Sequence, residues 1–324
     1  MGSGRRVTVV SHGPNCLDGL TCAVVAARYF AGRRFEPVFV SNREIDEALQ
    51  RYEPTNPDDE ELWITDISWR EPATDLHLDS LIERGLRLYW VDHHKSAIDR
   101  RAEGHLKVPF TDFVLDDTYA ASRLLYEYLC RRMAERGESK PGLRAVHNLV
   151  MMADDVDRWV LRVPRSRELA LAVRAMEQAQ AYRVLLAMDS NITYTAEVEA
   201  ALERVTEALS ASLSMAEDTR HVARVGASGV AVVAAECEDY AGEIADRWNA
   251  DFGEAVFALY DRRSDAISLR RTPSCTVDLS RLAAAFGGGG HAAAAGCQMV
   301  TSRADRSAEI ARKMVDFLSR ETGT

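Results

Sequence analysis

Residues 86–95, LRLYWVDHHK, decide the fold of this chain. The first part of this stretch is rich in apolar and aromatic residues, as in a buried strand, and it leads directly into Asp92, His93 and His94. Imidazole nitrogens and carboxylate oxygens are common metal ligands, so three such side chains at the end of a strand indicate metal chemistry. The sequence therefore predicts a buried strand whose end carries a candidate metal site.

Strand and helix patterns alternate between residue 6 and this stretch. Four β-rich segments predict strands at residues 6–12, 36–41, 62–67 and 86–92. The segments between them have the helical spacing of apolar residues, at residues 20–30, 44–52 and 74–84. Continuous apolar strands separated by helices indicate a parallel sheet that is covered on both faces. Ligands of such sheets bind beyond the carboxyl ends of the strands, so polar residues at those ends are candidates for a site.

The rest of the chain predicts a helical region followed by a second α/β pattern. Helices are expected at residues 117–135, 143–152, 167–188 and 196–213. Farther on, strands are expected at residues 230–235, 255–260 and 266–271, with helices at 240–249, 277–286 and 303–320. We therefore expect a first domain over residues 1–195, a helical connector over 196–220 and a smaller domain over 221–324. Trp63, Trp90 and Trp159 are expected in the core rather than as platforms for a nucleobase.

Composition and charge narrow the classes of function. The chain has 324 residues, 47% of them hydrophobic and 28% charged, which is ordinary for a globular protein with two domains. Its formal net charge is -10, whereas a protein that binds duplex nucleic acid usually carries a basic face. We therefore expect no long duplex nucleic acid as a partner, although a few local arginines are enough to hold a nucleotide or a short oligonucleotide.

Cysteine spacing and apolar runs favour the interior of the cell. The six cysteines form no Cys-x-x-Cys pair, which argues against a zinc ribbon or a redox dithiol. The first residues contain no apolar signal region, and no apolar run reaches the about 18 residues that a membrane-spanning helix needs. The sequence thus favours a reduced, cytoplasmic protein without a membrane partner.

Polar side chains follow three of the four predicted strands. The candidates at these strand ends are His12, Asp18, Asp66, Asp92, His93 and His94, and a later helical stretch adds Asp154, Asp155 and Asp157. Considered singly, His12 is more typical of a loop residue and Asp66 of a turn. Together these residues are better explained by a site than by a solvent-exposed surface, because the ends of parallel strands meet at one edge of the sheet. Imidazoles and carboxylates without thiolate pairs suit Mn²⁺, Fe²⁺ or Mg²⁺, and two such ions can polarise a phosphoryl group and activate a water.

A glycine-rich stretch in the smaller domain indicates a second kind of site. Residues 287–290 are four glycines, and His291 and four alanines follow them. Consecutive glycines let backbone N–H groups approach an anion closely, and a helix beginning at His291 would add its positive end. A flexible linker is the alternative, but a histidine and an alanine run are unusual in a linker. On the preceding strand, Arg270 and Arg271 point to opposite faces, so that one of them can reach a phosphate.

These motifs, in this order along the chain, resemble those of the DHH phosphoesterase superfamily. The first three motifs of that family are matched by His12 with Asp18 and Gly19, by Asp66, and by Asp92, His93 and His94. The fourth motif is matched by Asp155 with Asp157 and Trp159. Residues 268–271, 287–291 and 294–296 are similar to the DHHA1 domain that accompanies it. The resemblance covers most of the chain and implies an α/β fold, with a parallel-sheet DHH domain followed by a smaller α/β DHHA1 domain that has a mixed sheet.

The resemblance also implies roles for individual residues. The residues in the positions of metal ligands are His12, Cys16 and Asp66 for one ion, and Asp18, Asp66, His93 and Asp155 for the other. Asp154 is the alternative to Asp155. The resemblance implies Mn²⁺, as two ions, for which Mg²⁺, Fe²⁺ or Co²⁺ could substitute. His94 would face the substrate phosphate, and Asp92 would orient the histidines. The expected substrate contacts, all in the smaller domain, are Arg270, Gly288, Gly289, Gly290 and His291, with Arg271 left as a solvated charge.

The sequence departs from the family pattern at position 16. The family has an aspartate four residues after the first histidine, where this chain has Cys16. A thiolate there could still bind a metal and would favour a softer ion, or the side chain could be an inert filler that weakens one site. Asn15 could instead supply an oxygen. Three outcomes remain open: a normal two-metal site, an altered or one-metal site, and an inactive relative.

The resemblance implies an enzyme, a metal-dependent phosphoesterase whose two domains close over short oligonucleotides or small nucleotides. Family substrates include short oligoribonucleotides, 3′-phosphoadenosine 5′-phosphate, cyclic dinucleotides and polyphosphate. A metal-activated water would attack phosphorus while His94, His291 and Arg270 balance the developing charge. The alternatives are an exopolyphosphatase-like hydrolase and a nucleotide-binding sensor that Cys16 has made inactive. A homodimer is compatible with each of these expectations.

Overall fold

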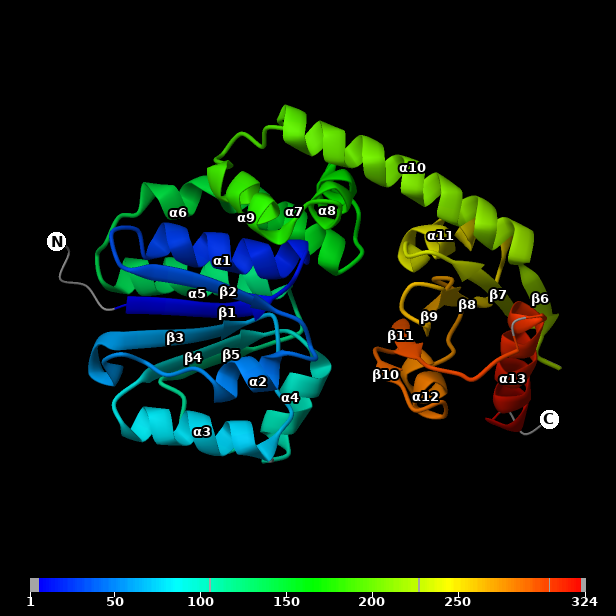
Figure 1. Ribbon diagram of the computed structural model, residues 1–324, viewed down its shortest axis with the longest axis horizontal. Helices are drawn as coiled ribbons and strands as arrows, with labels where there is room; N and C mark the ends of the chain where they lie inside the picture. The colour runs from blue at the N-terminus through cyan, green and yellow to red at the C-terminus, as the bar shows by residue number, and fades with distance from the viewer. Residues whose placement is uncertain (1–5, 105, 227, 303, 322–324) are drawn as a thin grey trace. The chain divides into compact units, whose positions relative to one another are not determined.

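The computed structural model describes residues 6–104, 106–226, 228–302 and 304–321 (Figure 1). These residues form two compact units that divide between Val205 and Thr206, inside helix α10 (Ala196–Thr219). The division lies within the segment that the sequence marks as a connector. Each unit has its own sheet and its own hydrophobic cores. Among the described residues, no helix is both long enough and apolar enough to cross a membrane.

The first unit is built on a parallel sheet of five strands in the order β2-β1-β3-β4-β5. The strands are β1 (Arg6–His12), β2 (Phe35–Val40), β3 (Glu60–Thr65), β4 (Arg87–Asp92) and β5 (Asp112–Leu115). The four strands predicted from the sequence, and their parallel arrangement, are thus confirmed. The sequence does not predict the edge strand β5, because this strand is short and its first two residues are exposed, so that it lacks a continuous apolar pattern.

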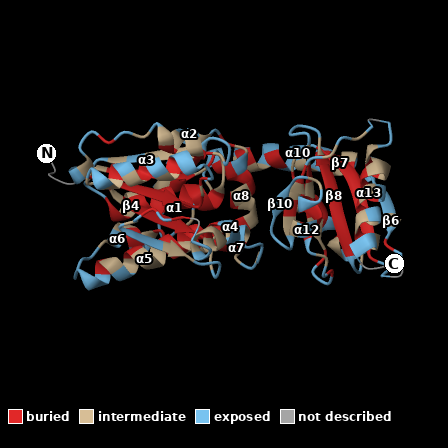
Figure 2. Cartoon of the chain, turned by 90° about the horizontal axis from the view of Figure 1, so that it is seen from below, coloured by how far each residue is buried: buried red, intermediate tan, exposed pale blue. Residues whose placement is uncertain are grey.

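Helices cover both faces of this sheet (Figure 1). One face carries α1 (Leu17–Tyr29), α5 (Ala121–Glu135), α6 (Pro141–Ala145), α7 (His147–Asp157), α8 (Ser166–Arg174) and α9 (Gln178–Ala187). The other carries α2 (Ile45–Gln50), α3 (Pro72–Glu83) and α4 (Lys95–Ala102). Along β1, Val9 packs with the first group of helices and Val10 with the second. The central strands are therefore buried on both sides (Figure 2), as their continuous apolar sequences indicate.

One predicted helix of the helical region is interrupted by a turn that the local sequence pattern does not predict. The apolar spacing over residues 167–188 predicts one helix, whereas the structure has α8 and α9 with a turn between them. The side-chain amide of Asn15 donates to the carbonyl oxygens of Arg174 (3.2 Å) and Met176 (2.6 Å). These hydrogen bonds satisfy backbone acceptors that the end of a helix leaves unpaired. The turn is thus stabilised by a residue 159 positions away from Arg174 in the sequence.

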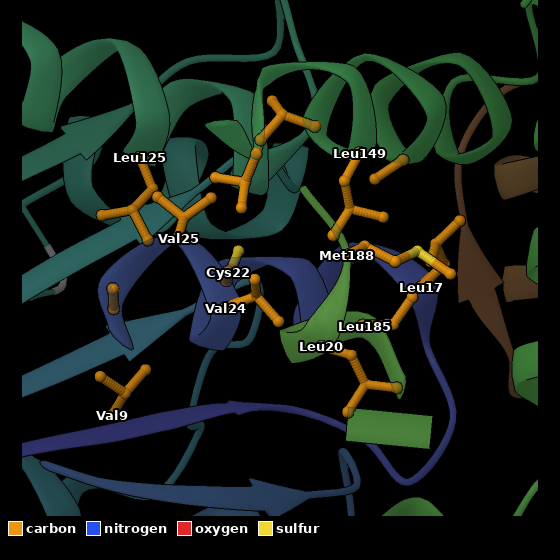
Figure 3. Close-up of a cluster of buried hydrophobic side chains, with 14 of the residues drawn as sticks. Val9, Leu17, Leu20, Cys22, Val24, Val25, Leu125, Leu149, Leu185 and Met188 are labelled. Carbon is orange, nitrogen blue, oxygen red and sulfur yellow. The ribbon is translucent and has the colours of Figure 1, made fainter. Parts of the chain in front are cut away.

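Helix α1 packs against β1 and β2 of the sheet and against the helices α5, α7 and α9. Figure 3 shows Leu20 and Val25 of α1 in the same apolar cluster as Leu125 of α5. Removing each of these side chains from water stabilises the packing by roughly 1.5–3 kcal/mol. Because Cys16 and Asp18 lie at the start of α1, this packing sets their position at the edge of the sheet.

The tryptophans of the first unit lie in different environments. Trp63 on β3 and Trp90 on β4 are fully buried in the two cores, as predicted. Trp159 is 42% exposed, so the prediction that it packs in the core is wrong. Trp159 follows the end of α7, where its backbone turns into the left-handed region with a φ of 54°. The chain therefore leaves the helix at Trp159 and does not continue into the core.

The second unit contains a mixed sheet of six strands in the order β10-β11-β9-β8-β7-β6. The strands are β6 (His221–Arg224), β7 (Ala231–Cys237), β8 (Ala255–Asp261), β9 (Ala266–Arg271), β10 (Gly289–Gly290) and β11 (Ala294–Cys297). β7 and β8 run parallel, and the other neighbouring pairs are antiparallel. The expected smaller α/β domain with a mixed sheet is therefore confirmed. β6, β10 and β11 are two to four residues long, which is too short to give a periodic signal in the sequence.

Helices pack on both faces of this second sheet. They are α11 (Ala241–Trp248), α12 (Leu279–Ala284) and α13 (Arg306–Glu321). Val232 of β7 packs in the core with α12 and α13, and its neighbour Val233 packs in the core with α11 and the end of α10. α12 begins at Asp278, whose side chain accepts hydrogen bonds from the first backbone N–H groups of the helix.

Gly19 sets the approach of α1 to the end of β1. A Cβ atom at this position would lie 2.1 Å from the backbone oxygen of His12, far inside contact distance. We predict that Gly19→Ala forces the two segments apart, displaces His12 and lowers the free energy of unfolding by about 1–3 kcal/mol, measured by chemical denaturation. Gly142→Ala is the matched control, because a Cβ there meets only the Arg28 side chain at 3.8 Å. Equal losses in the two variants would contradict the prediction.

Candidate metal centre

The carboxyl ends of three neighbouring strands meet at one edge of the first sheet. His12 is the last residue of β1, Asp66 follows β3, and Asp92 is the last residue of β4. Because β1, β3 and β4 are adjacent and parallel, their ends lie at the same edge of the sheet. This is the edge at which parallel sheets bind their ligands. The side chains there come from segments far apart in the sequence, and the sheet holds them together.

Asp66 lies at the centre of this edge. Its backbone has a φ of 58°, a left-handed conformation that aspartate adopts more readily than most residues, and its N–H donates to the carbonyl oxygen of Val91 (3.0 Å). Its carboxylate is buried. Oδ2 lies 3.6 Å from Nδ1 of His12 and 3.5 Å from Sγ of Cys16. Oδ1 lies 3.4 Å from Nε2 of His93, so one buried carboxylate faces donor atoms from three segments of the chain.

His93 connects Asp66 to two further carboxylates. Its Nε2 is also 3.4 Å from Oδ2 of Asp157, the last residue of α7. Ligand atoms of Asp18, His93 and Asp157 lie within 4.8 Å of one another. Asp18 is buried and is held by the start of α5, where the backbone N–H and the hydroxyl of Ser122 donate to its Oδ1. Helices α1, α5 and α7 therefore complete the cluster that the strand ends begin.

The side chains of this edge have the spacing and chemistry of metal ligands. Three groups place their ligand atoms within 4.8 Å: His12, Cys16 and Asp66; Asp66, His93 and His94; and Asp18, His93 and Asp157. Nε2 of His93 is buried and makes no hydrogen bond within the described part of the chain, although it lies against two carboxylates. A buried ring nitrogen without a partner is costly unless something else binds it. A divalent cation would bind it and the surrounding carboxylates, so these residues fit the metal that the sequence predicts.

The carboxylates and imidazoles of the cluster shift one another's pKa values. Burial by itself raises the pKa of Asp66, but the neighbouring imidazoles of His12 and His93 bring it below its ordinary value. Burial lowers the pKa of His93, whereas the surrounding carboxylates outweigh this effect and raise it to about 10. Burial and the charge of Asp66 raise the pKa of Asp157 to about 6, and they raise the pKa of Asp18 as well. The metal-free cluster therefore binds protons, which a cation would displace.

Asp92 holds the two histidines that follow it. Its Oδ1 accepts hydrogen bonds from the backbone N–H groups of His93 (2.7 Å) and His94 (3.0 Å), and it lies 2.7 Å from Nδ1 of the His94 ring. Its Oδ2 accepts a bond from the hydroxyl of Ser68 (2.5 Å). Burial lowers the pKa of His94, but the contact with Asp92 outweighs this and raises it to about 9. Asp92 therefore fixes the ring of His94 with a proton on Nδ1, which leaves Nε2 as its second polar atom.

Asp155 does not reach the cluster. Its Oδ1 accepts a hydrogen bond from the backbone N–H of Arg162 (2.8 Å). Its Oδ2 accepts bonds from the N–H of Val163 (3.1 Å) and the hydroxyl of Ser166 (2.6 Å). Arg162 and Val163 lie in the segment that joins α7 to α8, and Ser166 is the first residue of α8. The expectation that Asp155 is a metal ligand is therefore corrected, and Asp157 at the end of the same helix faces His93 instead.

Asp154, the alternative to Asp155, is also engaged elsewhere. Its carboxylate accepts hydrogen bonds from the N–H of Ala120 (2.9 Å) and the guanidinium of Arg123 (3.0 Å), at the start of α5. Successive helical residues point in directions about 100° apart, so three carboxylates within four positions face three different neighbours. The sequence contains all three, but only the packing of α7 decides which one faces the strand ends. The position of Asp157 at the last helical residue is the one signal that distinguishes it.

Cys16 lies where the family pattern has an aspartate. It immediately precedes α1, and its sulfur is 3.5 Å from the carboxylate of Asp66. Burial, followed by the charges of Asp66 and Asp157, raises the pKa of its thiol well above the ordinary value. The sulfur of the metal-free protein is therefore a neutral thiol, which must lose its proton to become a ligand. The amide nitrogen of Asn15 is bonded to the turn after α8, and its Oδ1 makes no hydrogen bond to any described residue.

The glycine-histidine stretch of the second unit forms a hairpin. β10 pairs with β11, and at the turn His291 and Ala294 exchange backbone hydrogen bonds of 2.7 and 3.3 Å. A Cβ at Gly288 would lie 2.0 Å from a backbone oxygen of β11, and Gly290 has a φ of 140°. These two glycines are therefore needed for the close approach of the strands. The expectation of a helix beginning at His291 is wrong, because the strand β11 follows the turn.

The two arginines of β9 have different partners. Arg271 donates to the carbonyl oxygens of Cys275 (2.6 Å) and Val277 (3.1 Å), so it fixes the loop after the strand. The expectation that Arg271 is a solvated charge is therefore wrong. Arg270 donates to the carbonyl oxygen of Leu269 (2.8 Å) and is paired across the sheet with Ala294 of β11, next to the turn of the glycine-histidine hairpin. Of the two arginines, Arg270 is the one that lies beside the expected phosphate contacts.

Known proteins share the sequence and the fold of this chain, although no protein-family model matches it. The oligoribonuclease NrnB of Bacillus subtilis (strain 168) is 27% identical over 299 residues, which cover 88% of this chain and 71% of NrnB. The structure of the pGpG-specific phosphodiesterase PggH from Vibrio cholerae matches with a TM-score of 0.57 at 13% identity, over 97% of this chain and 99% of PggH. The exonuclease RecJ bound to manganese matches with a TM-score of 0.54 at 16% identity, over 98% of this chain and 90% of RecJ.

The sequence similarity to NrnB and the fold shared with PggH and RecJ support the resemblance of this chain to the DHH superfamily of phosphoesterases. Its five-strand parallel sheet followed by a mixed six-strand sheet is the arrangement of proteins with a DHH and a DHHA1 domain. RecJ carries manganese in its structure, and in this chain the candidate position for a metal is the cluster around Asp66 and His93. The motif that names the superfamily is Asp92, His93 and His94 in this chain, and it lies at the edge of the sheet where the candidate ligands meet.

Asp157 and Asp155 give opposite predictions when each is replaced by asparagine. Asp157→Asn should weaken Mn²⁺ binding by at least about 10-fold while leaving the unfolding temperature nearly unchanged, because a proposed ligand is lost. Asp155→Asn should keep the metal but lower the free energy of unfolding by about 2 kcal/mol, because its charge-assisted hydrogen bonds are weakened. Isothermal titration calorimetry and thermal unfolding of both variants measure the two effects. The reverse pattern would make Asp155 the ligand.

Metal binding should be strongly pH-dependent. His93 has a pKa of about 10 in the metal-free protein, so at neutral pH its ring carries a proton that must leave before the nitrogen can bind a metal. We therefore expect Mn²⁺ affinity to rise between about pH 6 and about pH 8, with protons released on binding. Calorimetric titrations in buffers of different ionisation enthalpy count those protons. An affinity that does not change with pH would exclude His93 as a ligand.

Proposed function

We propose that this chain hydrolyses short oligoribonucleotides or small nucleotides in a metal-dependent reaction. The observation that carries the proposal is the cluster of buried carboxylates and imidazoles around Asp66 and His93. Two relatives support the class of substrate, since NrnB is named an oligoribonuclease and PggH a pGpG-specific phosphodiesterase. The net charge of -10 disfavours long duplex nucleic acid as the ligand.

Two divalent ions, with Mn²⁺ as the first choice, would be held by the residues of the cluster. The proposed ligands are His12, Cys16, Asp18, Asp66, His93 and Asp157. Bound ions would polarise the phosphoryl group and lower the pKa of the attacking water. Asp66 and His93 each belong to two of the three ligand groups, so these two residues would be central to holding the ions. The charges of Asp66 and Asp157 raise the pKa of Asp18, and the charge of Asp66 raises the pKa of Asp157, so a cation at this position would relieve the repulsion among these carboxylates.

His94 is the proposed contact to the phosphate that is attacked. Its Nδ1 is bonded to Asp92, which fixes the plane of the ring and supports its protonated form. The imidazolium can donate a hydrogen bond from Nε2 to a phosphate oxygen, and its charge offsets the negative charge that develops as the phosphorus is attacked. Asp92 acts through His94 and is a positioning residue, since its carboxylate is fully buried and has four hydrogen-bonding partners.

Residues of the second unit are further proposed contacts to phosphate. Arg270 can hold two phosphate oxygens at once with its planar guanidinium, and it lies beside the glycine-histidine hairpin. A Cβ added at Gly289 would meet no atom within 4 Å, so the backbone of this residue is open to a ligand, with Gly288 and Gly290 on either side. His291 at the turn of the hairpin is exposed and can add a further donor. These residues are proposed to bind phosphate and to balance charge.

A nucleotide sensor without turnover is the second candidate function. The observation that favours it is Cys16, a half-buried residue beside Asp66 whose raised thiol pKa disfavours the thiolate form that a metal ligand needs. If Cys16 does not bind a metal, the site with His12 and Asp66 is incomplete. The remaining group of Asp18, His93 and Asp157 could then hold one ion and a nucleotide without hydrolysing it.

The proposed activity is tested with purified protein, Mn²⁺ and a panel of phosphate compounds. We expect hydrolysis of pApA, pGpG and RNA a few nucleotides long, little hydrolysis of long duplex RNA, and loss of activity when a chelator removes the metal. Asp66→Asn should reduce turnover by more than about 100-fold. Loss of a residue that only orients a metal ligand typically costs up to about that factor, and Asp66 is a proposed ligand itself. Asp112→Asn, in the edge strand β5, is the matched control and should leave turnover unchanged. Turnover of polyphosphate without turnover of any nucleotide would contradict the proposal.

The substitution Cys16→Asp separates the enzyme from the sensor. The enzyme proposal expects wild-type protein to be active and Cys16→Asp to remain active, with a shift in metal preference towards the harder ions Mg²⁺ and Mn²⁺. The sensor proposal expects wild-type protein to bind nucleotide without turnover and Cys16→Asp to gain activity. Elemental analysis of both proteins gives the number of ions bound per chain.

A further inference from the structure

Trp159 occupies a position where the backbone favours glycine. Helix α7 ends at Asp157, and the N–H of Val160 then bonds back to the carbonyl oxygen of Asp155 (2.8 Å). This six-to-one bond is the usual way to close a helix, and the residue inside it takes a left-handed conformation that is normally given to glycine. Here that residue is Trp159, with a φ of 54°. A bulky side chain in this conformation is an outlier that needs a reason.

Burial does not supply that reason. Trp159 is 42% exposed, whereas Trp63, Trp69, Trp90 and Trp248 are exposed by at most 1%. A tryptophan that stabilised the fold would bury its large apolar surface, as those four do. Neither the backbone conformation nor packing therefore explains why an indole ring is present at position 159.

The segment that carries Trp159 is nevertheless fixed in place. Asp155 accepts two backbone hydrogen bonds and one hydroxyl hydrogen bond from the residues that follow, at Arg162, Val163 and Ser166. The guanidinium carbon of Arg167 lies 5.4 Å from the centre of the Trp159 ring. Unusual backbone conformations persist where the surrounding structure determines them, and they gather at functional sites. The carboxylate of Asp155 thus fixes the loop that carries Trp159, and the guanidinium of Arg167 lies beside the ring.

The backbone of Trp159 lies close to the metal cluster. Trp159 is two residues after Asp157, whose carboxylate is 3.4 Å from His93, and two residues span at most about 7 Å. The chain that follows Trp159 is basic, whereas Asp154, Asp155 and Asp157 precede it. Residues 158–174 contain five arginines and one acidic residue, although the net charge of the protein is -10. An exposed aromatic ring among arginines is the usual surface for a single-stranded nucleotide, because bases stack on the ring and phosphates meet the cations.

We propose that Trp159 is the platform on which a nucleobase of the substrate stacks, next to the phosphate held at the metal cluster. This inference rests on the proposed function and narrows it, since it requires a substrate with a base and disfavours polyphosphate. Stacking on a flat ring does not depend on hydrogen bonds to the edge of the base, so the site should accept different bases. Trp159 thus confers preference for nucleotides and takes no part in the bond cleavage.

The kinetic test compares pApA with a dinucleotide of the same backbone whose bases have been removed. We expect Trp159→Gly and Trp159→Ala to lower the ratio of kcat/KM for pApA to that for the abasic dinucleotide by about 10-fold or more, mainly through KM. Trp159→Phe should keep most of the ratio, because a ring remains. Val160→Ala, a change at an exposed neighbour that is 38% accessible, is the matched control and should keep all of it.

The unfolding temperature of Trp159→Gly distinguishes a role in binding from a role in the fold. If Trp159 stabilised the fold, this substitution would lower the unfolding temperature. Trp159→Gly places glycine where the backbone favours it, so its unfolding temperature should not fall by more than about 4 °C. A larger fall, or an equal loss of activity on both dinucleotides, would show that Trp159 acts on the fold and would overturn the proposal. An unchanged ratio in Trp159→Ala would overturn it too. A wild-type protein that hydrolyses neither dinucleotide would instead reject the proposed function itself.

Fluorescence tests the same contact by binding and requires no turnover. Four of the five tryptophans are buried, so quenching by a stacked base should come from Trp159. In the presence of Mg²⁺, AMP should quench the wild-type protein, and ribose 5-phosphate, which has the phosphate and sugar but no base, should not. Trp159→Phe should show no quenching with either compound. Equal quenching by both compounds, or quenching that persists in Trp159→Phe, would contradict stacking on Trp159.

Discussion

The buried carboxylate of Asp66 is the constraint on which the rest of the site depends. A carboxylate removed from water needs opposite charges or donors around it, and Asp66 finds them in His12, Cys16 and His93. These partners are separated by up to about eighty positions in the chain, and the order of β1, β3 and β4 in a parallel sheet brings them together. The topology of the first unit is therefore what makes the candidate metal site. The apolar packing of α1 keeps the thiol and Asp18 against it.

The end of α7 shows how one helix distributes three carboxylates among three tasks. Asp154 accepts hydrogen bonds from the start of α5, Asp155 organises the segment after the helix, and Asp157 faces His93. The first two carboxylates are nearly as buried as Asp66, but both are satisfied by donors, whereas His93 keeps an unsatisfied nitrogen beside Asp157. A candidate ligand thus differs from a structural aspartate because it lies next to a buried polar atom that has no hydrogen-bond partner. The same segment then presents Trp159, whose ring neither the backbone nor the core requires.

Much of the fold follows from the sequence, because the long elements carry strong periodic patterns. The four apolar strands, their parallel order and the polar residues at their ends could be predicted from residues 6–95. The short strands β5, β6, β10 and β11 could not, since their few residues pair only because a neighbouring strand is already in place. The choice of Asp157 over Asp155 and the exposure of Trp159 depend on how α7 packs, which a single sequence does not contain. His12, Asp18, Asp66 and His93 could be found because strand ends and motif order indicate them.

The most direct test of the central claim is to locate the metal in crystals grown with Mn²⁺. Anomalous diffraction at the manganese edge identifies each ion and the atoms around it. We expect the signal to lie within bonding distance, about 2.0–2.3 Å, of Asp66 and His93, with Asp157 among the ligands and Asp155 absent from them. An ion coordinated by His12, Cys16 and Asp66 would show that the thiol of Cys16 serves as a ligand. A manganese signal elsewhere in the protein, or none at this edge of the sheet, would contradict the account.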